Sequence, residues 1–169
     1  AAESLLHKPF EWYGKLFLRV TFAISRAQEF AADALSVRLV GKEPMQSALR
    51  RVNQVGPLYG YYLQHELLPM LNLGARPPIA QGFGMYLGSK AMQEVQVEFG
   101  EQAMQAKGNP YDTHPPLSQR IAAAEDVDGP GAARSDGALA ITLLKDLAGL
   151  EAELLAFLVG KQDVKQLPA

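Results

Sequence analysis

The chain has 169 residues, a formal net charge of −2 at pH 7, and no cysteine. This length fits one domain, and the 48% apolar content is that of a globular protein. The absence of cysteine excludes disulfides, thiol catalysis and Cys-based zinc sites. The weak negative charge argues against a nucleic-acid partner held through phosphate contacts.

The first residues have neither a signal-peptide pattern nor a membrane span. Glu3, His7 and Lys8 interrupt any apolar core near the N-terminus, and no run of about 18 uncharged apolar residues occurs elsewhere. The chain starts with Ala1 rather than Met, which is expected of a processed or truncated protein.

Residues 4–40 are predicted to form one long helix, with Gly41 as its C-cap. The first half of this helix carries a broad aromatic face with basic residues between the rings. An interfacial membrane helix fits this pattern, and so does a helix that packs on a core or on another part of the protein. The face consists of Phe10, Trp12, Tyr13, Leu16, Phe17, Val20 and Phe22, with Lys8, Lys15 and Arg19 interspersed.

The middle of the chain is predicted to be helical with several breaks. A second helix begins near Glu43, and glycine and proline interrupt it at residues 56–60. Residues 74–78 form a loop, and residues 79–106 form a further helical stretch. The aromatic segment 59–86 is either a flexible, substrate-facing lid or ordinary hydrophobic packing.

The last third of the chain is predicted to be short helices and polar loops. These are a turn at 107–113, a helix at 117–125 opened by Pro115-Pro116, an exposed loop at 126–137, a helix at 138–159 with its leucines inward, and a flexible tail at 161–169. No strand pattern occurs. We therefore predict an all-α fold of five to six helices with Gly/Pro-rich loops, in a single domain over residues 1–160.

Glu29 and Asp33 stand one helical turn apart and therefore project from the same face of the long helix. Two like charges at this spacing cost an isolated helix about 0.2–0.5 kcal/mol. Arg26, a metal ion or a partner helix could compensate this repulsion. The simpler alternative is a solvated polar stripe.

Of the three histidines, His114 is the best candidate for chemistry. His65-Glu66 begins like an H-E-x-x-H zinc motif, but the fifth position is Pro69, so the motif is absent. No sequence pattern around His7 suggests a partner for its imidazole. His114 precedes two prolines, which restrict the backbone and can hold the imidazole at the start of a helix. A capping or loop histidine is the simpler alternative.

Two separated stretches resemble one known family. Residues 25–33 (S-R-A-Q-E-F-A-A-D) resemble the S-R-x-x-E-x-x-A-D helix of the HtpX and CAAX-prenyl-protease family of zinc metallopeptidases, which are gluzincins. Residues 113–121 (T-H-P-P-L-S-Q-R-I) are similar to the H-P-P-x-x-x-R-[IL] motif of that family. The resemblance runs from about residue 20 to 160, with the motifs in the same order.

The resemblance implies a role at each matching position. Glu29 corresponds to the third zinc ligand, and Asp33 to the acid that orients a zinc-bound histidine. His114 corresponds to a histidine that stabilises the tetrahedral oxyanion or supplies a proton. Arg120 corresponds to a residue that braces this segment by pairing with a carboxylate.

The chain departs from the family pattern because it contains no H-E-x-x-H helix, which would supply two zinc ligands and the general base. We expect that helix upstream of Ala1, so that this chain is the C-terminal part of the peptidase domain, with residues 57–106 as an insertion. One carboxylate and one distant histidine do not make a three-ligand zinc site. The chain alone is therefore expected to be inactive and to bind no stoichiometric zinc.

The implied parent protein is a zinc endopeptidase of membrane-protein quality control, with a protein or peptide substrate and no nucleic acid. It is expected at the bacterial inner membrane or cell envelope, while this part alone is expected to be soluble. The alternative is a non-catalytic binding or chaperone-like helical module. An apolar groove beside Glu29 would also favour a dimer or domain-swapped oligomer through residues 5–30.

Overall fold

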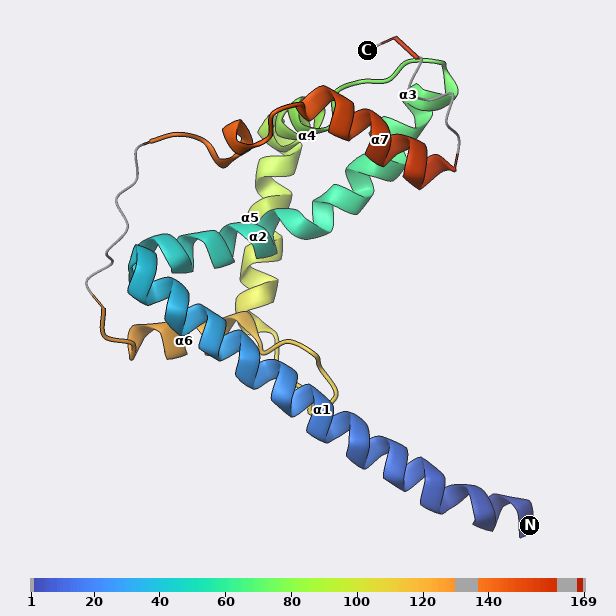
Figure 1. Cartoon of the computed structure of the whole chain (residues 1–169), viewed down its shortest axis with the longest axis vertical. Helices are drawn as coiled ribbons and strands as arrows, with labels where there is room; N and C mark the ends of the chain where they lie inside the picture. The colour runs from blue at the N-terminus through green and yellow to red at the C-terminus, as the bar shows by residue number, and fades with distance from the viewer. Residues whose placement is uncertain (1, 130–136, 161–166, 169) are drawn as a thin grey trace. The chain divides into compact units, whose positions relative to one another are not determined.

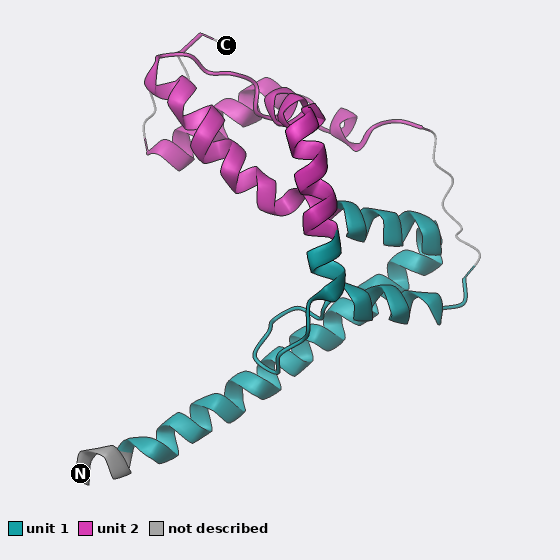
Figure 2. Cartoon of the chain, turned by 180° about the vertical axis from the view of Figure 1, so that it is seen from behind, with its two compact units in different colours: residues 1–51, 101–134 teal, residues 52–100, 135–169 magenta. Residues whose placement is uncertain are grey.

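The computed structural model describes residues 2–129, 137–160 and 167–168, with side chains from residue 7 onward. These residues form helices and no strand, which confirms the predicted all-α fold. They divide into two compact units (Figure 2). Unit 1 comprises residues 1–51 and 101–134, and unit 2 comprises residues 52–100 and 135–169. The single domain over 1–160 with an insertion at 57–106 stays a prediction.

Unit 1 is built on the predicted long helix, α1 (Ala2–Val40), drawn in blue in Figure 1. Gly41 ends it with a φ of 96°, a value that favours glycine, and the Gly41 N–H donates to the Val37 carbonyl oxygen over 2.8 Å. Helix α6 (Leu117–Glu125) packs against α1. Val37, Met45 and Ala124 form the buried core where α1, the start of α2 and α6 meet.

Helix α2 (Lys42–Tyr62) does not break at residues 56–60, so that prediction was wrong. Proline inside a helix removes one backbone hydrogen bond, but burial of apolar side chains can offset the loss. Leu58 and Tyr62 are both buried just beyond Pro57, and they hold the last turns of α2 in the core of unit 2.

None of the described helices is both long enough and apolar enough to cross a membrane.

Unit 2 surrounds a second buried cluster. Its elements are the end of α2, a π-helix η1 (Leu63–Leu67), α3 (Leu68–Asn72), α4 (Ile79–Gly88), the start of α5 (Lys90–Gln105), a 3₁₀ turn η2 (Ala140–Leu143) and α7 (Leu147–Val159). The cluster comprises Tyr62, Leu67, Leu71, Ile79 and Leu155. The predicted stretch 79–106 is thus two helices, because Ser89 is extended (ψ 146°) and its hydroxyl donates to the Tyr86 carbonyl oxygen over 2.9 Å.

The predicted helix at 138–159 is shorter than expected, since α7 begins only after Asp146. The Asp146 carboxylate accepts the Gly149 N–H over 2.9 Å, which caps the new helix. Of the leucines predicted to face inward, Leu155 is buried, whereas Leu143 and Leu150 are exposed. The predicted tail at 161–169 lies mostly outside the described residues, as does most of the loop at 126–137.

Helix α4 begins against a buried carboxylate from α7. Glu151 is 9% exposed, and its two oxygens accept the N–H groups of Ile79 over 3.0 Å and Ala80 over 2.7 Å. These are two of the four N–H groups that a helix start leaves without a partner. The negative charge also suits the positive end of the helix dipole. The Glu151 side chain therefore connects α7 to α4 through two hydrogen bonds.

We predict that Glu151→Ala lowers the free energy of unfolding by about 2 kcal/mol, because one buried and one part-buried N–H group lose their acceptors. Urea unfolding followed by circular dichroism measures this change. The matched control is Glu94→Ala, which removes an exposed carboxylate on α5 and should change stability by less than about 0.5 kcal/mol. Equal losses in the two variants would contradict the capping role.

Candidate active site

Four side chains from the two motif segments meet in unit 1. Glu29 and Asp33 project from α1. His114 lies in the loop before α6, and Arg120 lies on the first turns of α6. Pro116 is the N-cap of α6 with extended backbone (ψ 145°), so the two prolines open the helix as predicted.

Arg120 binds both carboxylates of α1. Its Nε and Nη2 donate to the two oxygens of Asp33 over 2.7 and 2.6 Å, and its Nη1 lies 2.9 Å from Glu29 Oε2. Asp33 is only 5% exposed, so this pair is largely shielded from water. The repulsion between Glu29 and Asp33 is therefore offset by a partner helix. The simpler alternative of a solvated stripe is wrong, because Asp33 is buried.

The pairing raises the pKa of the Arg120 guanidinium above its usual range, first through the hydrogen bonds to Asp33 and further through the charges of Asp33 and Glu29. A cation with a higher pKa in the folded chain than in the unfolded chain stabilises the fold as long as its partners are charged. This holds while the pH is below the pKa of the cation in the unfolded chain. The contribution is thus present at neutral and alkaline pH, where the two carboxylates are charged, and is lost at the upper end only when the pH is high enough to deprotonate the guanidinium.

His114 contacts the remaining oxygen of Glu29. Its Nδ1 lies 2.9 Å from Glu29 Oε1, and the side chain of His114 is 68% exposed while that of Glu29 is 27% exposed. A carboxylate only accepts hydrogen bonds, so Nδ1 is the protonated nitrogen in this contact. The four side chains therefore form one continuous series, His114–Glu29–Arg120–Asp33, that ends at solvent.

Arg26 has a different role from the one considered at the sequence level. Its Nη1 donates to the carbonyl oxygens of Pro110 over 3.2 Å and Asp112 over 2.7 Å, rather than pairing with Glu29. Within the loop, the Asn109 N–H donates to Asp112 Oδ2 over 2.7 Å. Arg26 thus fastens to α1 the segment that ends in His114.

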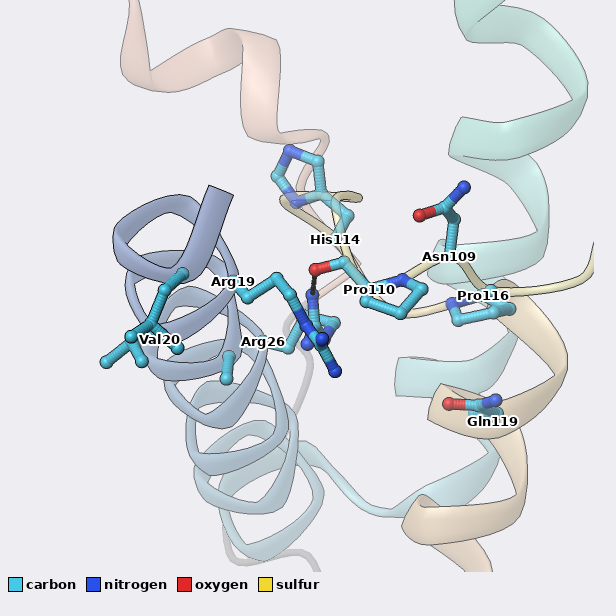
Figure 3. Close-up of a pocket in the computed structure, with 11 residues that line it drawn as sticks. Arg19, Val20, Arg26, Asn109, Pro110, His114, Pro116 and Gln119 are labelled. Atoms are coloured by element: carbon cyan, nitrogen blue, oxygen red, sulfur yellow. Dashed lines mark hydrogen bonds between the residues drawn. The ribbon is translucent and has the colours of Figure 1, made fainter. Parts of the chain in front are cut away.

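A groove of about 660 Å³ lies beside His114, between α1 and the loop. In Figure 3, Arg19 and Arg26 extend from α1 toward the loop, while Asn109 and Gln119 lie on the opposite side. The dashed line in the figure is the hydrogen bond from Arg26 to Pro110. The groove residues other than His114 were not predicted as site residues. The seven-residue spacing of Arg19 and Arg26, which places both on one helix face, is the signal that could have indicated them.

The sequence motifs can now be compared with known proteins. The model of peptidase family M48 matches residues 13–128, which include α1, the loop and α6. The chain belongs to peptidase family M48. Neither the comparison with curated proteins nor that with solved structures found a match.

The M48 family is generally zinc-dependent. Catalytic zinc needs three protein ligands. Among the described residues, no group of three or more His, Cys, Asp or Glu side chains could hold a metal. Glu29 and His114 supply one carboxylate and one imidazole, and the Arg120 cation lies 2.9 Å from Glu29. The described donors therefore do not fit a complete zinc site.

We predict that Arg120→Gln lowers the free energy of unfolding by about 2 kcal/mol, because Asp33 would remain buried without its cation. Urea unfolding of the chain provides the measurement. Arg19→Gln is the matched control, since Arg19 is exposed on α1 and its loss should cost less than about 0.5 kcal/mol. An Arg120→Gln midpoint equal to that of the unaltered chain would refute a structural role for the pair.

Proposed function

We propose that this chain is the part of a zinc-dependent M48 endopeptidase that supplies one metal ligand, Glu29, and a substrate-facing histidine, His114. The observation that carries the proposal is their contact at 2.9 Å, between residues 85 positions apart. The family resemblance assigns these two side chains to metal and substrate. The other two zinc ligands and the general base would come from an H-E-x-x-H helix in a segment that this sequence does not contain.

In such an enzyme, Glu29 would help to hold a zinc ion, which would supply Lewis-acid polarisation of a carbonyl and activation of water. The residues of this chain would act around that centre. Because Nδ1 of His114 is engaged by Glu29, Nε2 is the nitrogen left for a substrate oxygen. A neutral imidazole with its proton on Nδ1 has none on Nε2. His114 would therefore stabilise an oxyanion, or give up a proton, only as the imidazolium.

Asp33 and Arg120 would hold this arrangement in place. The resemblance assigns Asp33 to a zinc-bound histidine, and both Asp33 oxygens already accept hydrogen bonds from Arg120. Each carboxylate oxygen can accept more than one hydrogen bond, so Asp33 keeps capacity for an imidazole N–H. Asp33 would then act as a positioning residue for the metal ligands, as carboxylates commonly do around zinc.

The setting we propose is membrane-protein quality control at the bacterial inner membrane or cell envelope, with protein or peptide substrates. Many M48 peptidases are membrane-associated, which supports this proposal. The exposed aromatic side chains of α1 also support it, since Phe10 is 78% and Trp12 66% exposed. Interfacial helices carry this type of aromatic and basic surface.

A non-catalytic binding or chaperone-like module is the second candidate. The same exposed aromatic face favours it, because large apolar surfaces mark sites of interaction. The ion pair between Arg120 and Glu29 favours it as well, since the guanidinium lies where a metal cation would compete for the same carboxylate. The coding sequence upstream of Ala1 separates the two candidates, as only a peptidase requires H-E-x-x-H there.

We predict that the intact protein binds one zinc ion and cleaves an unfolded protein substrate, and that Glu29→Gln weakens zinc binding at least tenfold and abolishes cleavage. Calorimetric zinc titration and a casein assay measure the two effects. Glu43→Gln, which alters an exposed carboxylate on α2, is the control. The chain of 169 residues alone should show no cleavage and no submicromolar one-to-one zinc site. A tight site in the chain alone that depends on Glu29 would overturn the proposed division of ligands.

We also propose a dimer or domain-swapped oligomer through residues 5–30. Light scattering at high concentration should give a mass above that of one chain, because Phe10, Trp12, Tyr13 and Phe17 are all more than half exposed. Phe17→Ser should shift the mass toward the monomer, whereas Phe157→Ser, at an exposed site on α7 outside these residues, should not. A monomeric mass for the unaltered chain would rule out this assembly.

A further inference from the structure

We propose that the groove beside His114 binds a carboxylate group of the peptide substrate, and that Arg19 is the residue that selects it. The inference rests on the proposed function, since it names the substrate class of the same site. The groove has a volume of about 660 Å³ and is open along α1. Its lining includes the cations of Arg19 and Arg26 and the imidazole of His114, with no carboxylate among the lining residues.

Arg19 is the cation of the groove that is available for a ligand. It is exposed, and it makes no ion pair or hydrogen bond with any other described residue. Arg26 already donates to two carbonyl oxygens of the loop. The nearby carboxylates are engaged as well, because Asp112 accepts the Asn109 N–H, Glu29 pairs with His114 and Arg120, and Glu11 pairs with Lys15. The lining of the groove therefore carries two guanidinium cations and no carboxylate.

The opposite side of the groove offers neutral donors. Asn109 uses its side-chain oxygen to accept the Tyr111 N–H over 2.9 Å, which leaves its amide NH₂ group to donate. Gln119 presents a second amide across from Arg19 and Arg26 (Figure 3). A guanidinium fork facing amide donors matches a carboxylate, which accepts about four hydrogen bonds and donates none. A cationic peptide side chain would instead meet the like charges of Arg19 and Arg26, with no carboxylate in the lining.

The position of Arg19 predicts which substrate residue is selected. Arg19 precedes Glu29 by ten positions on one helix, which corresponds to roughly 15 Å along the helix axis. An extended peptide covers about 3.3 Å per residue. The selected carboxylate should therefore lie about four or five residues from the bond that is cleaved. An acidic side chain and a peptide C-terminus are both possible sources of this carboxylate.

The test uses ten-residue peptides in a neutral background, with one Glu or a matched Gln and with the C-terminus free or amidated. Binding to the ¹⁵N-labelled chain is measured by NMR at low salt, where exposed charges are least screened. We expect the Glu or free-acid peptide to bind about tenfold more tightly than its neutral match, with shifts at Asn109 and Gln119. Arg19→Gln should remove this preference and Arg19→Lys should keep part of it. Lys90→Gln, which removes an exposed cation from unit 2, should not change it.

Equal binding of the acidic and neutral peptides, or a preference that survives Arg19→Gln, would overturn the inference. Peptides with Glu at different positions then show which position binds most tightly. The amidated peptides show whether the groove binds a Glu side chain or the C-terminal carboxylate. Peptide binding does not require hydrolysis. An acidic preference can therefore be observed even if the chain is only a binding module. In the intact peptidase, cleavage with no acidic preference would refute the groove while leaving the proposed function in place.

Discussion

The guanidinium of Arg120 is the group on which the arrangement of unit 1 depends. It contacts two carboxylates on one face of α1, and it belongs to the helix that completes the core with Val37 and Met45. Without a cation at this place, Glu29 and Asp33 would repel one another across one helical turn, with Asp33 out of contact with water. The same contacts align α6 with α1 and thereby bring the loop that carries His114 to Glu29.

The two motifs thus have a structural role that is separate from any metal. A largely buried Asp–Arg pair at the base, a partly exposed Glu in the middle and an exposed His at the rim form a gradient from a shielded to a solvated environment. Charges at the shielded end are rigid because few other partners are available to them. The imidazole at the exposed end is restrained through the same series and can still reach a ligand. This is a suitable way to position a reactive side chain on a loop.

The local geometry of this site could be predicted, because it depends on residues that are close together in the sequence. The spacing of Glu29 and Asp33, and the two prolines after His114, specify a shared helix face and a helix start without reference to the rest of the chain. The family motifs added the expectation that the two segments belong together. The binding of Arg26 to the loop carbonyls could not be predicted, because backbone acceptors have no signature in the sequence. The continuation of α2 through Pro57 was missed because burial of Leu58 and Tyr62 outweighed a local preference.

The contact of Glu151 with the start of α4 has a consequence for how the protein is made. Each compact unit is assembled from two separate stretches, so synthesis on the ribosome delivers them in alternation. The described helices of unit 1 have emerged once α6 is complete, whereas α4 lacks its acceptor until a residue 72 positions later is added. At about 5–20 residues per second, this leaves α4 uncapped for several seconds. During that interval the buried cluster of residues 62–79 also lacks Leu155, the side chain from α7 that completes it.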